Sequence, residues 1–210
     1  MPGLVITIAQ RKGGAGKTTL AAQLAVAWAR LGARVAVLDI DPQGSLAAWV
    51  ELRRARLGAN ATGFDFAALP GWRASQWIED RARHADLVVI DNPPHAETEA
   101  QIAVRAAGLV LIPVQPSPLD LWATEATLKM ARDERRRPLI VLNRVPPRSG
   151  LTDRIAAEFA ETGTPVAANR IGNRIAFVRA MASGLGVLES ADTTSAAAEI
   201  NALADEVRKV

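Results

Sequence analysis

Two lysines stand five residues apart in a glycine-rich segment, and their spacing suggests phosphate binding. Residues 10–19 read Gln-Arg-Lys-Gly-Gly-Ala-Gly-Lys-Thr-Thr. Small residues let backbone N–H groups turn toward an anion, while Lys17 supplies a cation and Thr18 a hydroxyl for Mg²⁺. The strict phosphate-loop pattern has glycine where this chain has Arg11. The residues predicted to hold the phosphates are Gly13, Gly14, Ala15, Gly16, Lys17, Thr18 and Thr19.

Such a loop needs a strand before it and a helix after it, and the hydrophobic pattern predicts both. Short apolar runs indicate strands at residues 4–9, 34–39, 86–91, 109–114 and 138–143, with a weaker one at 165–168. Helices are predicted at residues 17–31, 45–57, 97–107, 119–135, 151–162, 174–182 and 192–207, and Gly32, Gly163 and Gly184 stand at expected helix ends. The alternation predicts an α/β fold with a doubly wound, mostly parallel sheet and helices on both faces.

We expect one domain over residues 1–210, because no repeat, low-complexity tract or linker interrupts the pattern. Residues 58–77 are the least regular stretch, and no function is assigned to them.

Carboxylates end two of the predicted strands. Asp39 and Asp41 lie on the same side of the chain at the end of one strand, where ligands of such sheets bind. Asp91 ends an apolar run, an arrangement that suits a carboxylate reaching Mg²⁺. For Asp39 there is an alternative, because a strand-ending Asp also caps helices.

Four motifs in this order resemble the ParA/MinD class of P-loop ATPases, which carries a deviant Walker A motif. They are KGGAGKTT at 12–19, DIDPQ at 39–43, DNPP at 91–94 and the proline-rich stretch at 113–118, and the likeness is strongest to small plasmid-type ParA proteins. In that class the early lysine crosses the interface of an ATP-bound dimer, at which the proline-rich stretch also lies. The resemblance gives this role to Lys12, although a solvated loop charge is the alternative.

The resemblance also implies the remaining site residues. Asp41 would position the attacking water, so the expected catalytic residues are Lys12, Lys17 and Asp41. Thr18, Asp39 and Asp91 would form the Mg²⁺ shell, and Asn143 stands where related ATPases read the adenine of ATP. His95 is expected to be a surface-loop histidine or a switch contact, because the family places no catalytic group there.

The amino-acid composition excludes several members of the ParA/MinD class. The chain has no Cys, which excludes disulfides and the thiolate metal sites of several relatives, and no Tyr, which excludes kinases with a tyrosine cluster. No apolar run approaches the ~18 residues that cross a bilayer. The last predicted helix contains four acidic residues, so we expect a docked core helix and not a MinD-type membrane anchor. These features favour a cytoplasmic protein without membrane insertion.

The charge distribution offers a candidate DNA-binding surface. The pI of 9.9 reflects missing Cys and Tyr, because the net charge is only +3. Residues 162–188 contain Arg170, Arg174 and Arg179 without an acid, in the region where ParA-type proteins bind DNA without sequence preference. Arg170 and Arg174 are spaced for one helix face, although a solvated face is the alternative. Arg53 and its basic neighbours remain ambiguous.

The resemblance therefore implies a Mg²⁺-dependent ATPase that is slow until a partner stimulates it. Its ATP-bound homodimer would bind DNA non-specifically on the nucleoid. A ParB-like or cargo-bound adaptor would link it to a plasmid, chromosome or protein-cluster cargo whose identity stays open. The alternative is a MinD-like regulator that acts through membrane or protein partners and not through DNA.

Overall fold

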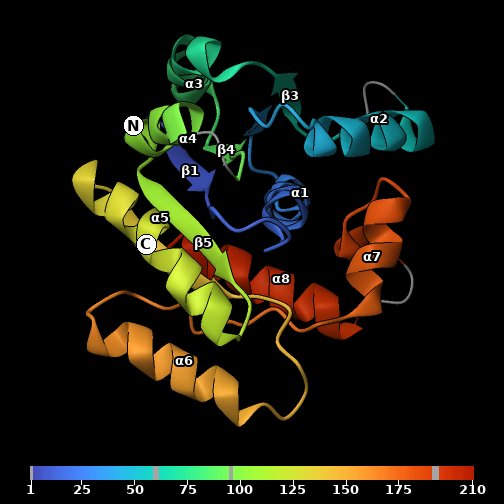
Figure 1. Ribbon diagram of the computed structural model, residues 1–210. Coiled ribbons are helices and arrows are strands. Elements are labelled where there is room, and N and C mark those ends of the chain that lie inside the picture. Colours follow the sequence, from blue (N-terminus) through green and yellow to red (C-terminus); the bar gives the residue numbers. More distant parts are fainter. Residues whose placement is uncertain (1, 59–61, 95–96, 191–193) are drawn as a thin grey trace.

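A parallel sheet carries the polar loops that the sequence predicts. The computed structural model describes residues 2–58, 62–94, 97–190 and 194–210, and within these ranges six strands pair in the order β3-β2-β4-β1-β5-β6 (Figure 1). The strands are β1 (Leu4–Ile8), β2 (Val35–Asp39), β3 (Asp65–Ala68), β4 (Leu87–Asp91), β5 (Leu109–Val114) and β6 (Arg137–Leu142). All pairings between them are parallel. The strand order changes direction at β1, so the loop after β1 lies at a topological switch point.

Helices cover both faces of the sheet because successive strand residues point to opposite sides. Ile6, Val37 and Leu111 belong to one core, whereas Ile112 and Ile90 belong to two cores on the other face. The first face packs against α1 (Lys17–Arg30), α2 (Ser45–Leu57), α7 (Ile175–Ala182), the short 3₁₀ turn η1 (Val187–Glu189) and α8 (Thr194–Val207). The second face packs against α3 (Gly71–His84), α4 (Glu97–Ala106), α5 (Pro118–Asp133) and α6 (Gly150–Glu161). The predicted doubly wound α/β fold is confirmed.

The C-terminal helix α8 is docked on α1. Ile200, Leu203 and Val207 are almost completely buried, and the indole Nε1 of Trp28 donates a hydrogen bond to the Ala204 carbonyl at 3.1 Å. The prediction of a docked core helix is thus confirmed.

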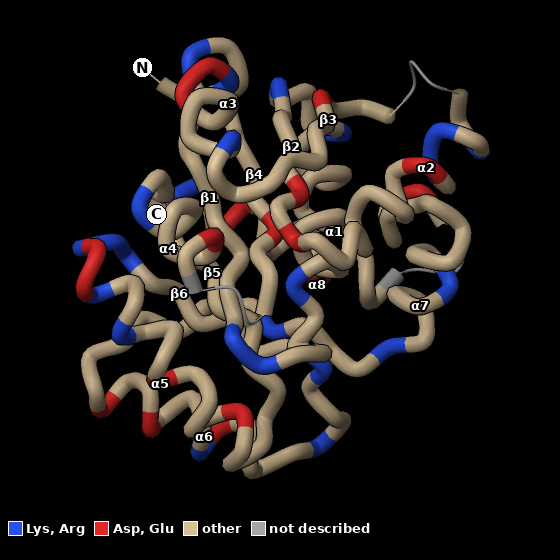
Figure 2. The backbone as a smooth tube through the Cα atoms, turned by 45° about the horizontal axis from the view of Figure 1, so that its top comes forward, with Lys and Arg blue, Asp and Glu red and all other residues tan. Residues whose placement is uncertain are grey.

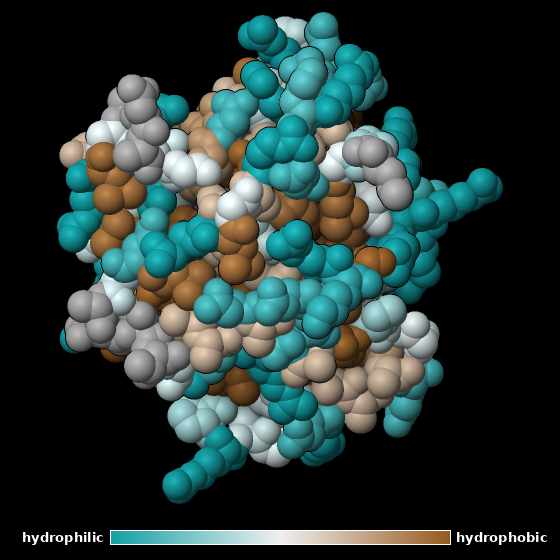
Figure 3. All heavy atoms as spheres, turned by 180° about the vertical axis from the view of Figure 1, so that it is seen from behind, coloured by the Kyte–Doolittle hydropathy of each residue, from teal (hydrophilic) through white to brown (hydrophobic). Residues whose placement is uncertain are grey.

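On the face seen in Figure 3, hydrophobic side chains are interspersed with hydrophilic ones. Among the described residues, no helix is both long and apolar enough to span a bilayer.

The structure differs from the sequence-based assignment mainly in residues 58–77. This stretch contains β3 and the start of α3, which the sequence left as irregular. β3 has only four residues at the sheet edge, too few for a clear alternation, and Pro70 and Gly71 obscure the helix start. Conversely, the weak strand at 165–168 is only an isolated bridge between Val166 and Ile140.

The predicted helix boundaries hold to within a few residues where they can be compared. Gly32, Gly163 and Gly184 have positive φ angles at helix ends, as expected. The predicted start of the last helix at Asp192 lies outside the described residues.

Replacing Trp28 with Ala should lower the free energy of unfolding by about 3–5 kcal/mol, because it leaves a cavity between α1 and α8. Urea denaturation followed by circular dichroism measures this loss. Trp72→Ala is the matched control: that side chain is 77% exposed, so stability should change by about 0.5 kcal/mol or less. Equal losses in the two variants would contradict the packing described here.

Candidate nucleotide-binding site

The glycine-rich loop joins β1 to α1 and leaves the helix N-terminus open. Gly14 and Gly16 have φ angles of +76° and +94°, a region that glycine enters without steric cost. The Leu20 N–H makes the first helical bond, to the Gly16 carbonyl at 2.9 Å. The preceding N–H groups therefore have no partner within the helix, and together with the helix dipole they favour an anion.

Two side chains of the first helical turn point into the same site. Lys17 is buried, and its Nζ donates a hydrogen bond to the Gln10 carbonyl at 3.0 Å. Burial lowers the pKa of Lys17, while the nearby carboxylates of Asp91 and Asp41 raise it. The Thr18 hydroxyl donates to Asp91 Oδ2 at 2.7 Å. The structure thus brings the lysine, the hydroxyl and the carboxylate of the sequence prediction together.

Asp91 is a buried carboxylate of the site with one oxygen that accepts no hydrogen bond from the described residues. It is 1% exposed, and its Oδ1 has no hydrogen-bond partner among the described residues. Burial raises the pKa of Asp91 to about 7, and Asp39 and Asp41 add to the rise, whereas the Thr18 hydroxyl and Lys17 oppose it. A hard divalent cation prefers oxygen ligands such as this carboxylate and the Thr18 hydroxyl. The free oxygen therefore fits Mg²⁺.

Asp39 and Asp41 shape the loop after β2. Asp39 is paired in register with Asp91 across the sheet. Its Oδ1 accepts from the Asp41 N–H at 3.0 Å, and its Oδ2 accepts from the Ala47 N–H in the first turn of α2 at 2.9 Å. Burial raises the pKa of Asp39, and these backbone donors lower it. The helix-end contacts of the alternative interpretation are therefore present, while the metal role of Asp39 stays a prediction.

Asp41 bends the chain away from the strand. Its Oδ1 accepts from the Gln43 N–H at 2.9 Å, and Gly44 follows with a φ angle of +62° before α2. The carboxylate of Asp41 contributes a small rise to the pKa of Lys17 in the phosphate loop. His95 lies outside the described residues.

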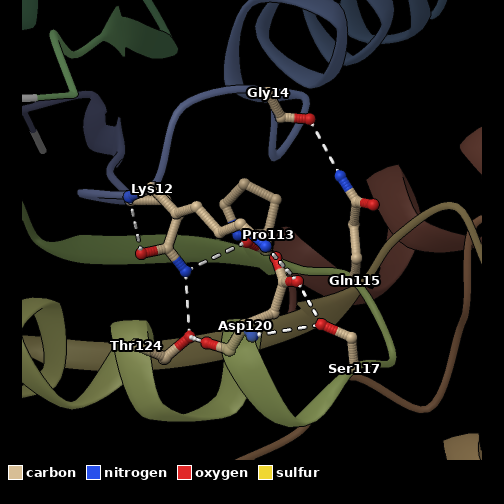
Figure 4. Close-up of polar contacts among 8 residues, drawn as sticks. Lys12, Gly14, Pro113, Gln115, Ser117, Asp120 and Thr124 are labelled. Carbon is tan, nitrogen blue, oxygen red and sulfur yellow. Dashed lines mark hydrogen bonds and ion pairs between the residues drawn. The ribbon is translucent and has the colours of Figure 1, made fainter.

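Lys12 points away from the other site residues. Its Nζ forms an ion pair with Asp120 Oδ2 at 2.6 Å, on the first turn of α5 (Figure 4). Lys12 is therefore a partly exposed cation with a buried acidic partner, and its role across a dimer stays a prediction. The proline-rich stretch of the sequence analysis contains Gln115, but the contact of Gln115 with the loop and the pairing of Asp120 with Lys12 were not predicted, because a motif does not show contacts across the fold.

A cavity of about 470 Å³ opens beside the loop. Gly16, Thr19, Asn143, Phe177, Val178 and Ile200 are among its lining residues. The Asn143 side-chain amide donates to the Ala15 carbonyl at 2.8 Å, and its Oδ1 accepts from the Arg144 N–H. Asn143 thus supports the loop from the cavity side. The wall that α7 and α8 contribute was not foreseen, because these helices carry no phosphate-binding motif.

The arginines predicted to bind DNA have acidic neighbours in space. Arg170 pairs with Asp153 of α6 at 2.7 Å, and Arg174 makes a bidentate contact with Glu199 of α8. The prediction that these arginines have no acidic neighbours is wrong, because segments distant in sequence supply the carboxylates of Asp153 and Glu199. Arg174 is the N-cap of α7, so it does not share a helix face with Arg170.

The structure also locates Arg179 and Arg53, two further arginines named in the sequence analysis. Arg179 lies in the last turn of α7. Arg53 is buried and pairs with Glu189 at 2.6 Å, so this formerly ambiguous residue ties α2 to η1.

Gly16→Ala should destabilise the loop, because the backbone is left-handed there and the new Cβ would lie 2.4 Å from Asn143 Nδ2. We expect the free energy of unfolding to fall by about 1–2 kcal/mol from the backbone conformation alone. Binding of a fluorescent ATP analogue should also become weaker. Gly13→Ala is the control, since a Cβ there meets nothing within 4 Å. Adding Asn143→Ala should recover only the steric part of the loss. Equal stability of Gly16→Ala and Gly13→Ala would contradict this geometry.

Comparisons with known proteins identify the family of this chain. The CobQ/CobB/MinD/ParA nucleotide binding domain family matches residues 6–187. "Maintenance of carboxysome distribution protein A" of Halothiobacillus neapolitanus is 32% identical, over 96% of this chain and 95% of the relative. The protein with the same description in Gloeobacter kilaueensis is 35% identical, over 88% and 84%. The septum site-determining protein MinD of Pyrococcus horikoshii, solved with Mg-ADP, shares the fold at a TM-score of 0.81 and 18% identity, with 99% and 96% of the chains covered. The chain belongs to the CobQ/CobB/MinD/ParA family of nucleotide-binding domains.

Proposed function

We propose that this chain is an ATPase that dimerises when ATP is bound and positions a cargo on DNA. The observation that carries the ATPase proposal is the contact between Thr18 and the buried Asp91, with one carboxylate oxygen still free. Relatives named for carboxysome distribution support a positioning role, with a protein compartment among the candidate cargoes beside a plasmid or chromosome. The ATP-bound form would lie on the nucleoid in the cytoplasm.

The phosphates would lie on the N-terminus of α1, with Lys17 beside them. Lys17 needs only to exchange the Gln10 carbonyl for a phosphate oxygen. Thr18 and Asp91 would hold Mg²⁺, which would supply positive charge to the phosphates when bound. Asp41 would accept a hydrogen bond from the attacking water, and Asp39 would hold the Asp41 backbone through the contact already present.

The adenine would enter the cavity beside Gly16. Its volume is that of a small-molecule site, and Phe177, Val178 and Ile200 give it apolar walls. Asn143 borders this cavity while it supports the loop, so we propose that its contact with Ala15 couples base binding to phosphate binding.

A second copy of the chain and an adaptor complete the proposed cycle. Lys12 would reach the phosphates of the partner copy, where a cation stabilises the charge that develops during phosphoryl transfer. A cargo-bound, ParB-like adaptor would stimulate hydrolysis and thereby release the dimer from DNA.

The proposed DNA surface includes α7 and the segment that leads into it. Arg170, Arg174 and Arg179 belong to it, but the first two share their charge with acids. Arg144 and Arg148, in the loop between β6 and α6, have no acidic partner among the described residues. Val145 bridges to Gly172, so this loop runs beside the segment that leads into α7, and Figure 2 shows basic positions along both. We therefore add Arg144 and Arg148 to the predicted DNA contacts.

Asp41→Ala should separate dimerisation from hydrolysis. Losing the group that positions water should lower the ATPase rate by about 100-fold or more, while the ATP-bound dimer persists. Phosphate release and sedimentation velocity with ATP measure the two properties. Glu51→Ala, an exposed carboxylate on α2, is the control and should change neither. Unimpaired hydrolysis by Asp41→Ala would remove Asp41 from the mechanism.

DNA retention should require ATP and decrease steeply with salt. If about four phosphates are neutralised, affinity should fall roughly 100-fold between 50 and 200 mM salt, because counterions are released on binding. Fluorescence anisotropy with ATP or ADP measures this. Arg148→Ala should weaken binding and reduce the salt dependence, whereas Arg83→Ala, an exposed residue at the end of α3, should not.

Two outcomes would contradict the DNA proposal. One is equal binding with ADP and ATP. The other is ATP-dependent flotation with anionic liposomes in place of DNA retention, which would favour the MinD-like alternative.

A further inference from the structure

The phosphate loop begins where the backbone hydrogen bonds of the sheet end. Strand β1 ends at Ile8, and the Ala9 N–H still donates to the Leu111 carbonyl at 3.0 Å. The next residue, Gln10, supplies the main-chain carbonyl that accepts the hydrogen bond of Lys17 Nζ at 3.0 Å. The position of this carbonyl therefore decides where the ammonium of Lys17 lies before a phosphate arrives.

The side chain of Gln10 is almost completely buried, and each of its hydrogen-bonding positions is used. Nε2 donates to the Thr124 hydroxyl at 2.9 Å and to the Pro113 carbonyl at 3.4 Å, and dashed lines at these two residues in Figure 4 mark the bonds. Oε1 accepts from the Thr127 hydroxyl at 3.3 Å and from the Lys12 N–H at 3.4 Å. Because an amide has two donor and two acceptor positions, these partners define a single orientation of the side chain.

Two threonines of α5 hold this arrangement. Thr124 and Thr127 are almost completely buried, and their spacing of three residues puts both on one face of the helix. The Thr124 hydroxyl donates to the Asp120 carbonyl at 2.7 Å, which leaves its lone pairs for Gln10. The Thr127 hydroxyl accepts from the Arg11 N–H at 3.3 Å. The start of the loop is thus fixed by α5 instead of by a neighbouring strand.

We propose that Gln10 is a positioning residue for Lys17, and that Thr124 and Thr127 set the affinity of the loop for phosphate through it. This proposal rests on the proposed function, in which Lys17 binds the phosphates of ATP. A buried amide without partners is unfavourable, so Gln10 stays where the threonines satisfy it. Its carbonyl then keeps the Lys17 ammonium beside the N-terminus of α1, where the phosphates are expected.

The arrangement lowers the cost of binding a phosphate. A loop that is already ordered loses little backbone freedom when a ligand arrives. The later part of the loop is held in a similar way, because the Gln115 amide donates to the Gly14 carbonyl and the Asn143 amide donates to the Ala15 carbonyl. Side chains from three segments of the chain thus order the loop before any nucleotide binds.

Thr124→Val tests the proposal, because it removes the hydroxyl and nearly keeps the shape of the side chain. Isothermal titration calorimetry measures binding of tripolyphosphate, which carries no base, and of ATP. Both affinities should fall about tenfold, the scale of ordering the backbone of one residue. Thr152→Val is the matched control and should change neither affinity, because this buried threonine lies on α6 and its hydroxyl has no partner among the described residues.

The link through Gln10 has a test of its own. Thr124 contacts the loop through the Gln10 amide. In a Gln10→Leu background, Thr124→Val should therefore lower the tripolyphosphate affinity no further, because both substitutions remove the same contact. Additive losses would show that Thr124 acts by another route and would overturn the role of Gln10.

A measurement without any ligand reads the order of the loop directly. Amide hydrogen exchange in the nucleotide-free chain is followed by NMR at the Lys12 N–H, which donates to Gln10 Oε1. Thr124→Val should accelerate this exchange several-fold. The Leu20 N–H, bonded to the Gly16 carbonyl in α1, should keep its rate, whereas a general loss of stability would accelerate both.

The readouts separate this proposal from the proposed function. Faster exchange at Lys12 in a protein whose wild type binds neither ATP nor tripolyphosphate would support the ordering role of Gln10 and contradict the proposed function. Unchanged exchange at Lys12 in Thr124→Val would overturn the role of Gln10. So would an unchanged or higher tripolyphosphate affinity of Thr124→Val in a protein whose wild type binds this anion.

Discussion

The register of the parallel sheet is the constraint on which the site depends. Asp91 on β4 is opposite both Ile8 on β1 and Asp39 on β2. This register brings the ends of three strands to one edge, so that the phosphate loop and two carboxylates meet there. Because both faces of these strands are buried, a shift by one residue would exchange the two cores. Hydrophobic packing of the strands thus fixes where the carboxylates at their ends lie.

The register of the sheet also brings several carboxylates together at a largely buried site. Asp39, Asp41 and Asp91 each influence the ionisation of a neighbour, and Lys17 is the cation among them. Burial acts against both charge types, raising the pKa of Asp91 and lowering that of Lys17. A cation and a polyanion arriving together would relieve both penalties, which gives a physical reason for joint binding of metal and nucleotide.

Short motifs in the sequence predicted the residues that meet at the phosphate loop. The loop at 10–19 and the strand-ending Asp91 follow from patterns a few residues long, the resemblance predicted that they share a site, and the structure brings Lys17, Thr18 and Asp91 together. Contacts of residues with partners outside these motifs were not predicted. The acids opposite Arg170 and Arg174 come from α6 and α8, and the partner of Lys12 is 108 residues away. β3 was missed for another reason, since four residues at an edge are too few for a pattern.

The cavity beside Gly16 has a wall that comes from a segment far along the chain. Ile200 of α8 lines it, and α8 is held against α1 by the contact between Trp28 and Ala204. The ribosome makes this helix roughly 180 residues after the loop, a delay of about 10–40 s at ~5–20 residues per second. A nascent chain therefore exposes a phosphate loop long before it can enclose a base. If the base binds there as proposed, nucleotide that meets the chain before α8 has been made would be held through its phosphates alone.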